Sequence, residues 1–439
     1  MKNYLILIPC LILLCCGCHK TADWKKAADN PEFIHRSVNE ITQVMLHDIY
    51  SPPQASRIYA YISVAGYEAA LHGDKKYTSL AGKLHGLKPM PQPDPHKEYC
   101  FNLAAVEAIT KVGKKLITTE GMVSNFHDKV LQEFKATGMP DSVFENSIAF
   151  GDQIAKATLA WASKDNYKQS RSLPKYQVST DSGTWKPTPP GYMKAVEPHW
   201  DQIRTFVIDS ASQFRPIAPA PFSKEKSSAF YKMAMAVYNT GLHLTPEQHN
   251  MADFWDCNPF KMATNGHVMF AVKKISPGGH WVNIAAMIAK KEKADYIRSA
   301  QTYAYLSPVI ADVFVSCWEE KYRTQVIRPE TYINQYIDQH WVPALQTPPF
   351  PEYTSGHSVV SAASAQVLTK LYGDNYSYVD STESEFGLNS RKFKSFKLAA
   401  QEAAMSRFYG GIHYMPAITT GLDEGTKIGD FAIDKLKIK

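Results

Sequence analysis

Apolar residues recur every three to four positions through most of this chain, which is the pattern of helices that bury one face. Strand patterns are few, so the sequence predicts an all-α fold. One helix start is explicit, because Thr245 can cap a helix, Pro246 suits its first turn and Gln248 completes a capping box. The expected helices cover residues 36–49, 56–71, 97–116, 123–137, 141–164, 223–239, 245–256, 281–291, 294–322, 356–372, 393–408 and 416–436.

Proline and glycine mark the breaks between these helices. Residues 82–96 are rich in both and should form a loop, and the Pro277-Gly278-Gly279 run should break the chain before the helix at 281. Residues 165–200 are polar and rich in proline, which predicts a surface loop over the site or a joint between subdomains. The expected organisation is a signal segment at 1–17, an N-terminal helical region at 18–220 and a C-terminal helical bundle with the site at 221–439.

The N-terminus has the features of an export signal. Lys2 precedes an apolar run over 4–16 that is too short for a comfortable membrane span. The run ends in a sequence that resembles a bacterial lipoprotein signal, with cleavage after Gly17 and lipid on Cys18. A plain secretory signal is the alternative. Both predict an exported protein, and the lipid would anchor it to a bacterial cell membrane, on the periplasmic side or at the outer membrane.

Composition narrows the class of protein. Hydrophobic residues make up 44% and charged residues 21%, which is typical of a globular chain. The formal charge is only +6 and the lysines are scattered, so we expect no nucleic-acid surface. Beyond the N-terminal segment the cysteines are Cys100, Cys257 and Cys317. Their wide spacing is neither a disulfide framework nor a zinc pattern, and buried free thiols are as probable as one bridge.

The first segment with recognisable chemistry pairs two cations. Lys321 and Arg328 are seven residues apart, nearly two helical turns, so they should point to one side of a helix. Pro329 disfavours helical geometry at Arg328 and should end the helix there. The two cations are thus expected at a helix terminus that faces a shared pocket.

The second segment is Ser355-Gly356-His357, at the start of an apolar helix of small residues. A helix N-terminus presents free amides and a partial positive charge. Gly356 has no side chain to keep an anion away, and Ser355 can donate a hydrogen bond to it. A serine nucleophile paired with His357 is disfavoured, because the usual Gly-x-Ser-x-Gly elbow is missing.

The third segment places Arg407 at a helix end and His413 in the turn before the last helix. Gly410-Gly411 should break the helix between them. The three segments together offer three cations, a hydroxyl, a glycine amide and two histidines. That set suits a tetrahedral oxyanion such as phosphate or vanadate, with two histidines left to react.

In this order, the segments resemble the signature of the superfamily of vanadium-dependent haloperoxidases and type 2 phosphatidic acid phosphatases, Lys-x6-Arg-Pro, Ser-Gly-His and Ser-Arg-x5-His. The resemblance implies a helical fold around a four-helix bundle core. Trp318, three residues before the motif lysine, and Phe350, seven before His357, favour the haloperoxidases, especially the chloroperoxidases, in which the phenylalanine lines the halide region. Ala417 stands where the family often has aspartate, so a carboxylate that orients a histidine must come from elsewhere or is absent.

The resemblance also implies a role for each motif residue. Asp256 is a loose match to the acid that braces the motif arginine. The other implied roles are clamping of the equatorial oxygens by Lys321, Arg328 and Arg407, hydrogen bonding to them by Ser355 and the Gly356 amide, axial bonding to vanadium or phosphorus by His413, and acid–base chemistry by His357.

We therefore expect a haloperoxidase-like enzyme that oxidises halide with hydrogen peroxide at a histidine-bound vanadate. The alternative is a phosphatase that hydrolyses phosphomonoesters through a phosphohistidine at the same site, since a vanadate with an axial histidine has the shape of a phosphoryl-transfer transition state. A second alternative is a lipoprotein that binds an oxyanion without catalysis. The sequence leaves the halide and the oligomeric state open.

Overall fold

A computed structural model of the chain describes residues 24–265 and 267–438. The predicted signal at 1–17 and the lipid attachment site Cys18 lie outside the described residues. The rest is predominantly helical, and the predicted all-α fold is confirmed. None of the described helices combines the length and the apolar character that crossing a membrane requires.

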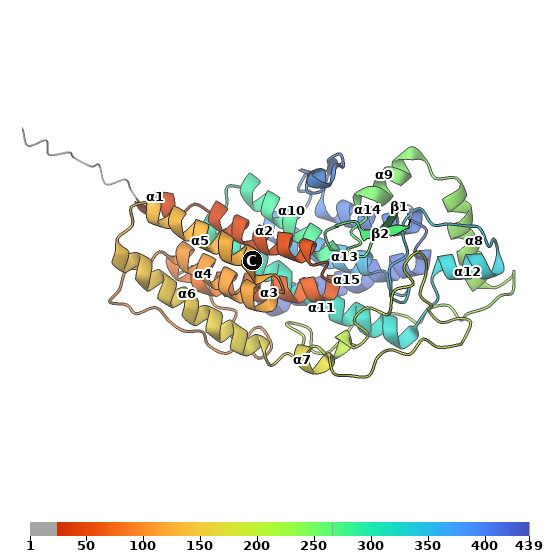
Figure 1. Cartoon of the computed structure of the whole chain (residues 1–439), viewed down its shortest axis with the longest axis horizontal. Helices are drawn as coiled ribbons and strands as arrows, with labels where there is room; N and C mark the ends of the chain where they lie inside the picture. Colours follow the sequence, from red (N-terminus) through yellow and green to blue (C-terminus); the bar gives the residue numbers. More distant parts are fainter. Residues whose placement is uncertain (1–23, 266, 439) are drawn as a thin grey trace, which may run out of the picture.

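The helices form an elongated body. In Figure 1 the N-terminal helices α1 to α6 occupy one end, and α8, α9 and α12 lie at the other. The bounds are α1 (Trp24–Ala28), α2 (Glu32–His47), α3 (Pro52–Ala70), α4 (Phe101–Leu116), α5 (Glu120–Ala136), α6 (Asp141–Ala162), α7 (Tyr167–Ser170), α8 (Ala229–Leu242), α9 (Pro246–Phe254), α10 (Pro277–Lys291), α11 (Tyr296–Thr324), α12 (Pro329–Tyr336), α13 (Gly356–Tyr372), α14 (Phe396–Tyr409) and α15 (Met415–Leu436).

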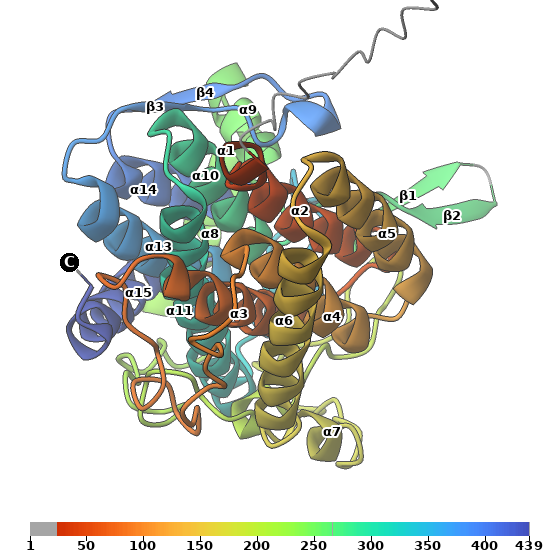
Figure 2. The same ribbon diagram turned by 90° about the vertical axis from the view of Figure 1, so that its left-hand side faces the viewer.

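Two short antiparallel hairpins, which the sequence did not predict, accompany the helices. The first pairs β1 (Met262–Asn265) with β2 (Val268–Ala271), and Figure 2 shows it projecting from the helical body. The second pairs β3 (Tyr378–Asp380) with β4 (Arg391–Phe393) beside α9 and α10 (Figure 2). Each strand has only three or four residues, which is too short to show a clear period-two pattern.

The core runs through both halves of the chain. One cluster of buried side chains extends from Ala28 to Ile438, so the N-terminal and C-terminal helices share a hydrophobic interior. Within it α11 packs against α3 and α13, and α13 packs against α14 and α15. Glycines on α15 allow the last contact, because a Cβ on Gly425 would collide with the Val359 carbonyl of α13. This close approach fixes α13, which carries the second motif at its first turn.

Most predicted helices are confirmed within a few residues, and 356–372 is confirmed at both ends. The capping box at Thr245 is also confirmed. The predicted break at the Pro277-Gly278-Gly279 run is wrong. Ser276 accepts a hydrogen bond from the Gly279 amide and caps α10, so the proline and glycines form its first turn. Proline fits there because a first-turn amide needs no partner within the helix.

Candidate active site

A small cavity of about 30 Å³ lies where the first turn of α13 meets the end of α14 and the turn before α15. Its wall includes the Gly356, His357, Arg407 and His413 positions of the second and third motifs. Lys321, Arg328 and Ser355 are fully buried beside these residues. The structure thus brings together all three predicted segments, although they are as much as 92 residues apart in the chain (413 − 321).

Arg328 reaches the site by a route that differs from the prediction. Helix α11 ends at Thr324 and Gln325 is left-handed, so Arg328 does not share a helix with Lys321. Arg328 instead is the extended residue before α12, a helix that the sequence did not predict. The prediction that Lys321 and Arg328 lie on one face of the same helix was therefore wrong, although the two cations do lie beside the same cavity. Pro329 begins a helix here and does not end one.

The Arg328 guanidinium is held by three acceptors. Its Nε donates to the Phe350 carbonyl at 2.9 Å, and its Nη1 donates to the Ile412 carbonyl at 2.9 Å. The Nη1 atom also lies 3.1 Å from His413 Nε2. The buried Nη2 has no hydrogen-bond partner among the described residues. The two N–H groups of Nη2 are therefore available to an added acceptor.

The hydrogen bonds around His413 define its tautomer. An arginine nitrogen can only donate, so Nε2 must accept from Arg328 and the ring hydrogen must sit on Nδ1. That Nδ1–H donates to Glu352 Oε1 at 2.9 Å. Burial and the charges of Arg328, Lys321 and Arg407 keep the pKa of His413 well below its ordinary value. His413 is thus neutral at neutral pH and carries a lone pair on Nε2.

Glu352 supplies the carboxylate that position 417 lacks. The Tyr414 amide donates to the same Oε1 at 2.9 Å, which fixes this carboxylate against the turn that carries His413. Burial raises the pKa of Glu352 to about 7, and Arg328 and Lys321 oppose that shift. Ala417 is fully buried and its carbonyl accepts from the Ser355 amide at 3.1 Å. The orienting acid therefore precedes the second motif and does not follow the third.

Lys321 is fully buried in the last turns of α11 and holds the loop that leads to α13. Its ammonium donates to the carbonyls of Pro351, Glu352 and Thr354 at 3.0, 3.0 and 2.5 Å. These contacts occupy its three donors. Burial lowers the pKa of Lys321 to about 8. In this arrangement the lysine positions the Glu352 and Ser355 segment and contributes positive charge to the site.

The first turn of α13 presents Gly356 and His357 to the cavity. Ser355 is the N-cap, and its Oγ accepts from the Ser358 amide. A Cβ on Gly356 would meet no protein atom nearer than Trp318 at 3.8 Å, so packing does not demand glycine there. The buried His357 Nε2 has no hydrogen-bond partner among the described residues. Burial and the charge of Arg407 keep the pKa of His357 well below its ordinary value.

Arg407 is braced by a carbonyl. Its Nη1 donates to the Trp255 carbonyl at 3.0 Å, while its buried Nε has no partner among the described residues. The looser expectation that Asp256 braces this arginine is not what the structure shows. Asp256 Oδ2 pairs with Lys261 at 2.8 Å and acts on Arg407 only through its charge.

Aromatic rings form the apolar part of the wall. The rings of Trp318 and Phe350 lie 4.9 Å apart between centroids, and both line the cavity. Phe350 also lies under two cations, with Lys321 Nζ at 5.3 Å and the Arg328 guanidinium at 5.1 Å from its ring centroid. Rings in this position keep water from the cations and strengthen their action on an anion.

Comparison with known proteins agrees with this geometry. A family model described as the VCPO second helical-bundle domain matches residues 301–438. A solved structure of a bacterial vanadium-dependent iodoperoxidase is similar over 92% of this chain and 96% of that chain, with 47% identity and a TM-score of 0.88. This chain belongs to the vanadium-dependent haloperoxidase family.

More distant vanadium haloperoxidases show the same fold. A bacterial vanadium-dependent chloroperoxidase in its holo form is 15% identical, with a TM-score of 0.64, and covers 89% of this chain and 94% of that chain. A comparison with curated protein sequences finds no match. Family membership makes the chain a haloperoxidase-like enzyme whose expected cofactor is vanadate.

The residues of this haloperoxidase fit a bound vanadate. Arg328 Nη2, Arg407 Nε and His357 Nε2 are buried nitrogens without partners among the described residues. Leaving such groups unpaired costs about 1–3 kcal/mol each, so an anion that pairs with them is stabilised. His413 Nε2, which accepts from Arg328 in this structure, is the nitrogen that the motif implies as the vanadium ligand, and a bound vanadate would take the place of that hydrogen bond.

Sequence reasoning missed Glu352 as a functional residue of this haloperoxidase. It stands three residues before Ser355, and the motif itself does not include it. An acidic residue in an apolar segment that is otherwise rich in proline was the available indication. Its partner His413 is 61 residues away, so the pairing follows only from the fold.

Proposed function

We propose that this haloperoxidase oxidises iodide with hydrogen peroxide. The observation that supports it best is the neutral His413, whose Nε2 lone pair lies beside a partly unpaired arginine while Nδ1 is fixed by Glu352. The similarity to an iodoperoxidase at 47% identity favours iodide as the halide. Bound vanadate would supply the activation of hydrogen peroxide toward the halide.

The protein's own groups would hold the cofactor by charge and hydrogen bonds. Arg328 and Arg407 offer N–H donors, and Gly356 offers an amide at a helix N-terminus. Lys321 and Ser355 hold the first turn of α13 through hydrogen bonds with backbone groups. Lys321 would also attract the anion by its charge, and the Ser355 hydroxyl would donate a hydrogen bond to it, as the motif implies. His413 is the residue that would bond directly to vanadium.

His357 is the proton carrier in this proposal. Burial and, after it, the positive charge of Arg407 lower its pKa, and a bound anion would offset the part that is due to charge. The histidine can then take up a proton when the anion is present, which a general acid–base group requires. Its Nε2 has no competing partner among the described residues.

The apolar wall suits a large halide. Phe260, Phe314 and Phe350 line the cavity and offer no hydrogen bonds to replace the hydration of an ion. Trp318 also lines it, but its indole N–H already donates to the Val196 carbonyl. The cost of removing an ion from water falls as its radius grows, so iodide enters such a wall more easily than chloride. This physical argument and the sequence similarity favour the same halide.

We also propose that the mature protein is exported and attached to a bacterial membrane through lipid on Cys18. The support is the N-terminal sequence alone, with Lys2, the apolar run over 4–16 and the Gly17-Cys18 pair. Metabolic labelling with a radioactive fatty acid tests it. Wild type should incorporate label and Cys18→Ala should not.

The activity test compares two reactions on the purified mature chain. Iodide, bromide and chloride oxidation is measured with hydrogen peroxide, with and without vanadate, and hydrolysis of a chromogenic phosphomonoester is measured without vanadate. We expect iodide oxidation that requires vanadate and is lost in His413→Ala. A protein that oxidises no halide between about pH 4 and 8, yet hydrolyses the phosphoester, is the phosphatase alternative. A folded protein that does neither is the oxyanion-binding lipoprotein.

A further inference from the structure

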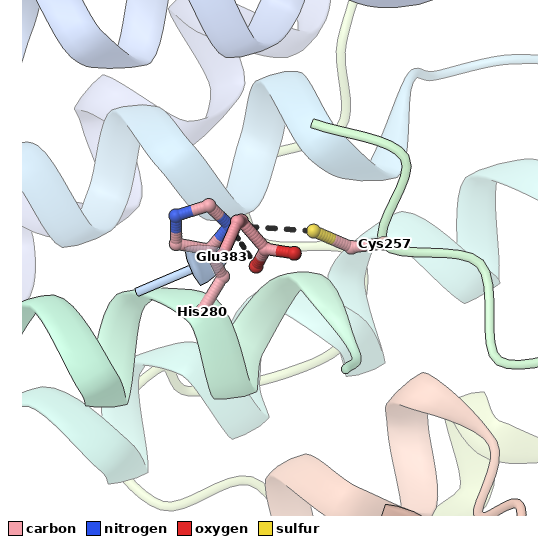
Figure 3. A group of neighbouring side chains, drawn as sticks. All are labelled: Cys257, His280 and Glu383. Atoms are coloured by element: carbon pink, nitrogen blue, oxygen red, sulfur yellow. Dashed lines mark hydrogen bonds and ion pairs between the residues drawn. The ribbon is translucent and has the colours of Figure 1, made fainter. Parts of the chain in front are cut away.

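A second cluster of reactive side chains lies outside the proposed vanadate ligands. Cys257 follows α9, His280 is in the first turn of α10, and Glu383 precedes a short helical turn between β3 and β4. Figure 3 shows the cysteine and the glutamate directed at the same nitrogen of His280. Cys257 Sγ lies 3.4 Å from His280 Nδ1, and Glu383 Oε1 lies 3.1 Å from it.

This cluster is buried and incompletely paired. The exposed fractions of Cys257, His280 and Glu383 are 2%, 0% and 1%. Glu383 Oε1 lies within ion-pair distance of His280 Nδ1, but no described group meets the geometry of a hydrogen bond to it. The Cys257 sulfur and this oxygen converge on one nitrogen, which can carry only a single proton. A divalent cation between the three groups would interact with all of them at once.

The separations match those between the ligands of a tetrahedral metal ion. Bonds of about 2.3 Å to sulfur, 2.05 Å to nitrogen and 2.1 Å to oxygen place sulfur about 3.6 Å and oxygen about 3.4 Å from nitrogen. The observed 3.4 and 3.1 Å are close to these values. The three ligand atoms all lie within 4.8 Å of one another. Small outward movements would therefore admit an ion.

The groups around His280 orient it as a ligand. Its Nε2 lies 2.9 Å from Asp380 Oδ2, which leaves Nδ1 for the cysteine and the glutamate. Asp380 is fixed in turn by the amide and hydroxyl of Thr382, at 3.0 and 2.6 Å. Trp255 stacks on the imidazole at 4.5 Å. A carboxylate behind a histidine is the usual support of a metal-bound imidazole.

We propose that Cys257, His280 and Glu383 bind a divalent transition-metal ion of the zinc class. A thiolate with an imidazole selects such ions over magnesium and calcium, which prefer oxygen ligands only. Thiolate and glutamate charges together balance a divalent ion. The ion's competitor at Nδ1 is a proton, because Asp380 and Glu383 raise the pKa of His280 well above its ordinary value although burial opposes them.

The proposed metal would also support the vanadate site. Cys257 lines the oxyanion cavity, and the carbonyl of Trp255, two residues earlier, accepts from Arg407. A metal bond to Cys257 would restrain this segment and hence the carbonyl that positions the arginine. The metal itself is a separate site, so its binding can be tested without vanadate.

The experiment measures metal binding by the purified mature chain after chelation and re-exposure to Zn²⁺ or Co²⁺. We expect one ion per chain and, with Co²⁺, a thiolate-to-cobalt charge-transfer absorption. Cys257→Ser should abolish that absorption, and Glu383→Gln should weaken Zn²⁺ binding. Asp380→Asn should weaken it by about 10- to 100-fold, as the loss of a supporting carboxylate does. The controls Cys100→Ser and Cys317→Ser, which alter the other buried thiols, should retain the absorption.

Three results would overturn the proposal. They are a wild-type chain that retains no stoichiometric Zn²⁺, a Co²⁺ spectrum without a thiolate band, and folded Cys257→Ser and Glu383→Gln variants that bind Zn²⁺ as tightly as wild type. The last result would indicate adventitious binding elsewhere. The wild-type spectrum decides the question even where a variant fails to fold.

Discussion

Replacing Glu352 with glutamine separates the charge of the buried acid from its shape. The amide oxygen of glutamine can still accept from His413 Nδ1 and the Tyr414 amide, both now at 2.9 Å. The negative charge disappears, while the tautomer of His413 is kept because Arg328 still donates to Nε2. The variant therefore tests whether the carboxylate strengthens His413 as a ligand.

The magnitude follows from the hydrogen bond that His413 Nδ1 donates to Glu352, because this bond affects how strongly Nε2 can act as a ligand. A hydrogen bond to a charged acceptor contributes about 1.5–3 kcal/mol and one to a neutral acceptor about 0.5–1.5 kcal/mol. The difference is about 1–1.5 kcal/mol, or roughly five- to thirteenfold in vanadate affinity. That value is near the lower end of the 10- to 100-fold loss of metal affinity that is typical when a carboxylate supporting a histidine ligand is removed. We expect Glu352→Gln to bind vanadate about tenfold more weakly at pH 8.

The same comparison should depend on pH. The pKa of Glu352 is raised to about 7, so the wild-type carboxylate is charged above that pH and protonated below it. Below it, wild type and Glu352→Gln both present a neutral acceptor to His413. The ratio of the two vanadate affinities should therefore fall toward one in acid. Any effect of pH on vanadate itself is the same for both proteins and cancels in this ratio.

The assay is calorimetric titration of vanadate into both proteins at matched pH values. Glu247→Gln is the control, since Glu247 is exposed and pairs with Arg391 away from the cavity. Equal affinities for wild type and Glu352→Gln at pH 8 would refute the role given to the carboxylate. A ratio that stays constant from pH 8 to well below about 7 would refute the titration argument.

Other variants probe different parts of the account. Arg407→Ala should weaken vanadate binding about 10- to 100-fold by calorimetry, for the loss of one charge-assisted contact, while Arg391→Ala should not. Gly356→Ala should leave the melting temperature unchanged or slightly higher, because the added Cβ would meet only Trp318, at 3.8 Å. The same variant should bind vanadate more weakly. A loss of stability with normal vanadate affinity would contradict this expectation. Asp312→Asn should lower the free energy of unfolding by about 1–3 kcal/mol, measured in denaturant. The two carboxylate oxygens of Asp312 accept from the amides of Phe206, Val207 and Ile208, and an asparagine side chain has only one oxygen to replace them. Asp209→Asn, at an exposed aspartate, is the control.

The sequence predicted what local chemistry controls. Helices with clear periodicity and caps were found where expected, as at α9 and α13, because their residues set their own boundaries. The site segments were recognised because each is a short run of residues. The break at 277–279 was misjudged because proline and glycine occupy a helix's first turn as readily as a loop, and only the cap at Ser276 distinguishes the two.

Contacts between distant segments could not be predicted in this way. The pairing of Glu352 with His413 depends on how α13 packs on α15, and that packing depends on glycines such as Gly425. The approach of Cys257, His280 and Glu383 is a stronger case, because no spacing in the sequence relates them. Both clusters arise from tertiary packing of residues that look unremarkable one at a time.

The central claim is that His413 binds vanadate through Nε2 in a cage that includes Arg328 and Arg407. The most direct test is a crystal structure of the mature protein grown with vanadate, with vanadium located by its anomalous scattering. The account predicts one vanadium per chain bonded to His413 Nε2, with the two arginines donating to its oxygens. Vanadium bonded to another residue, or none in the cavity of a crystal grown at saturating vanadate, would contradict it.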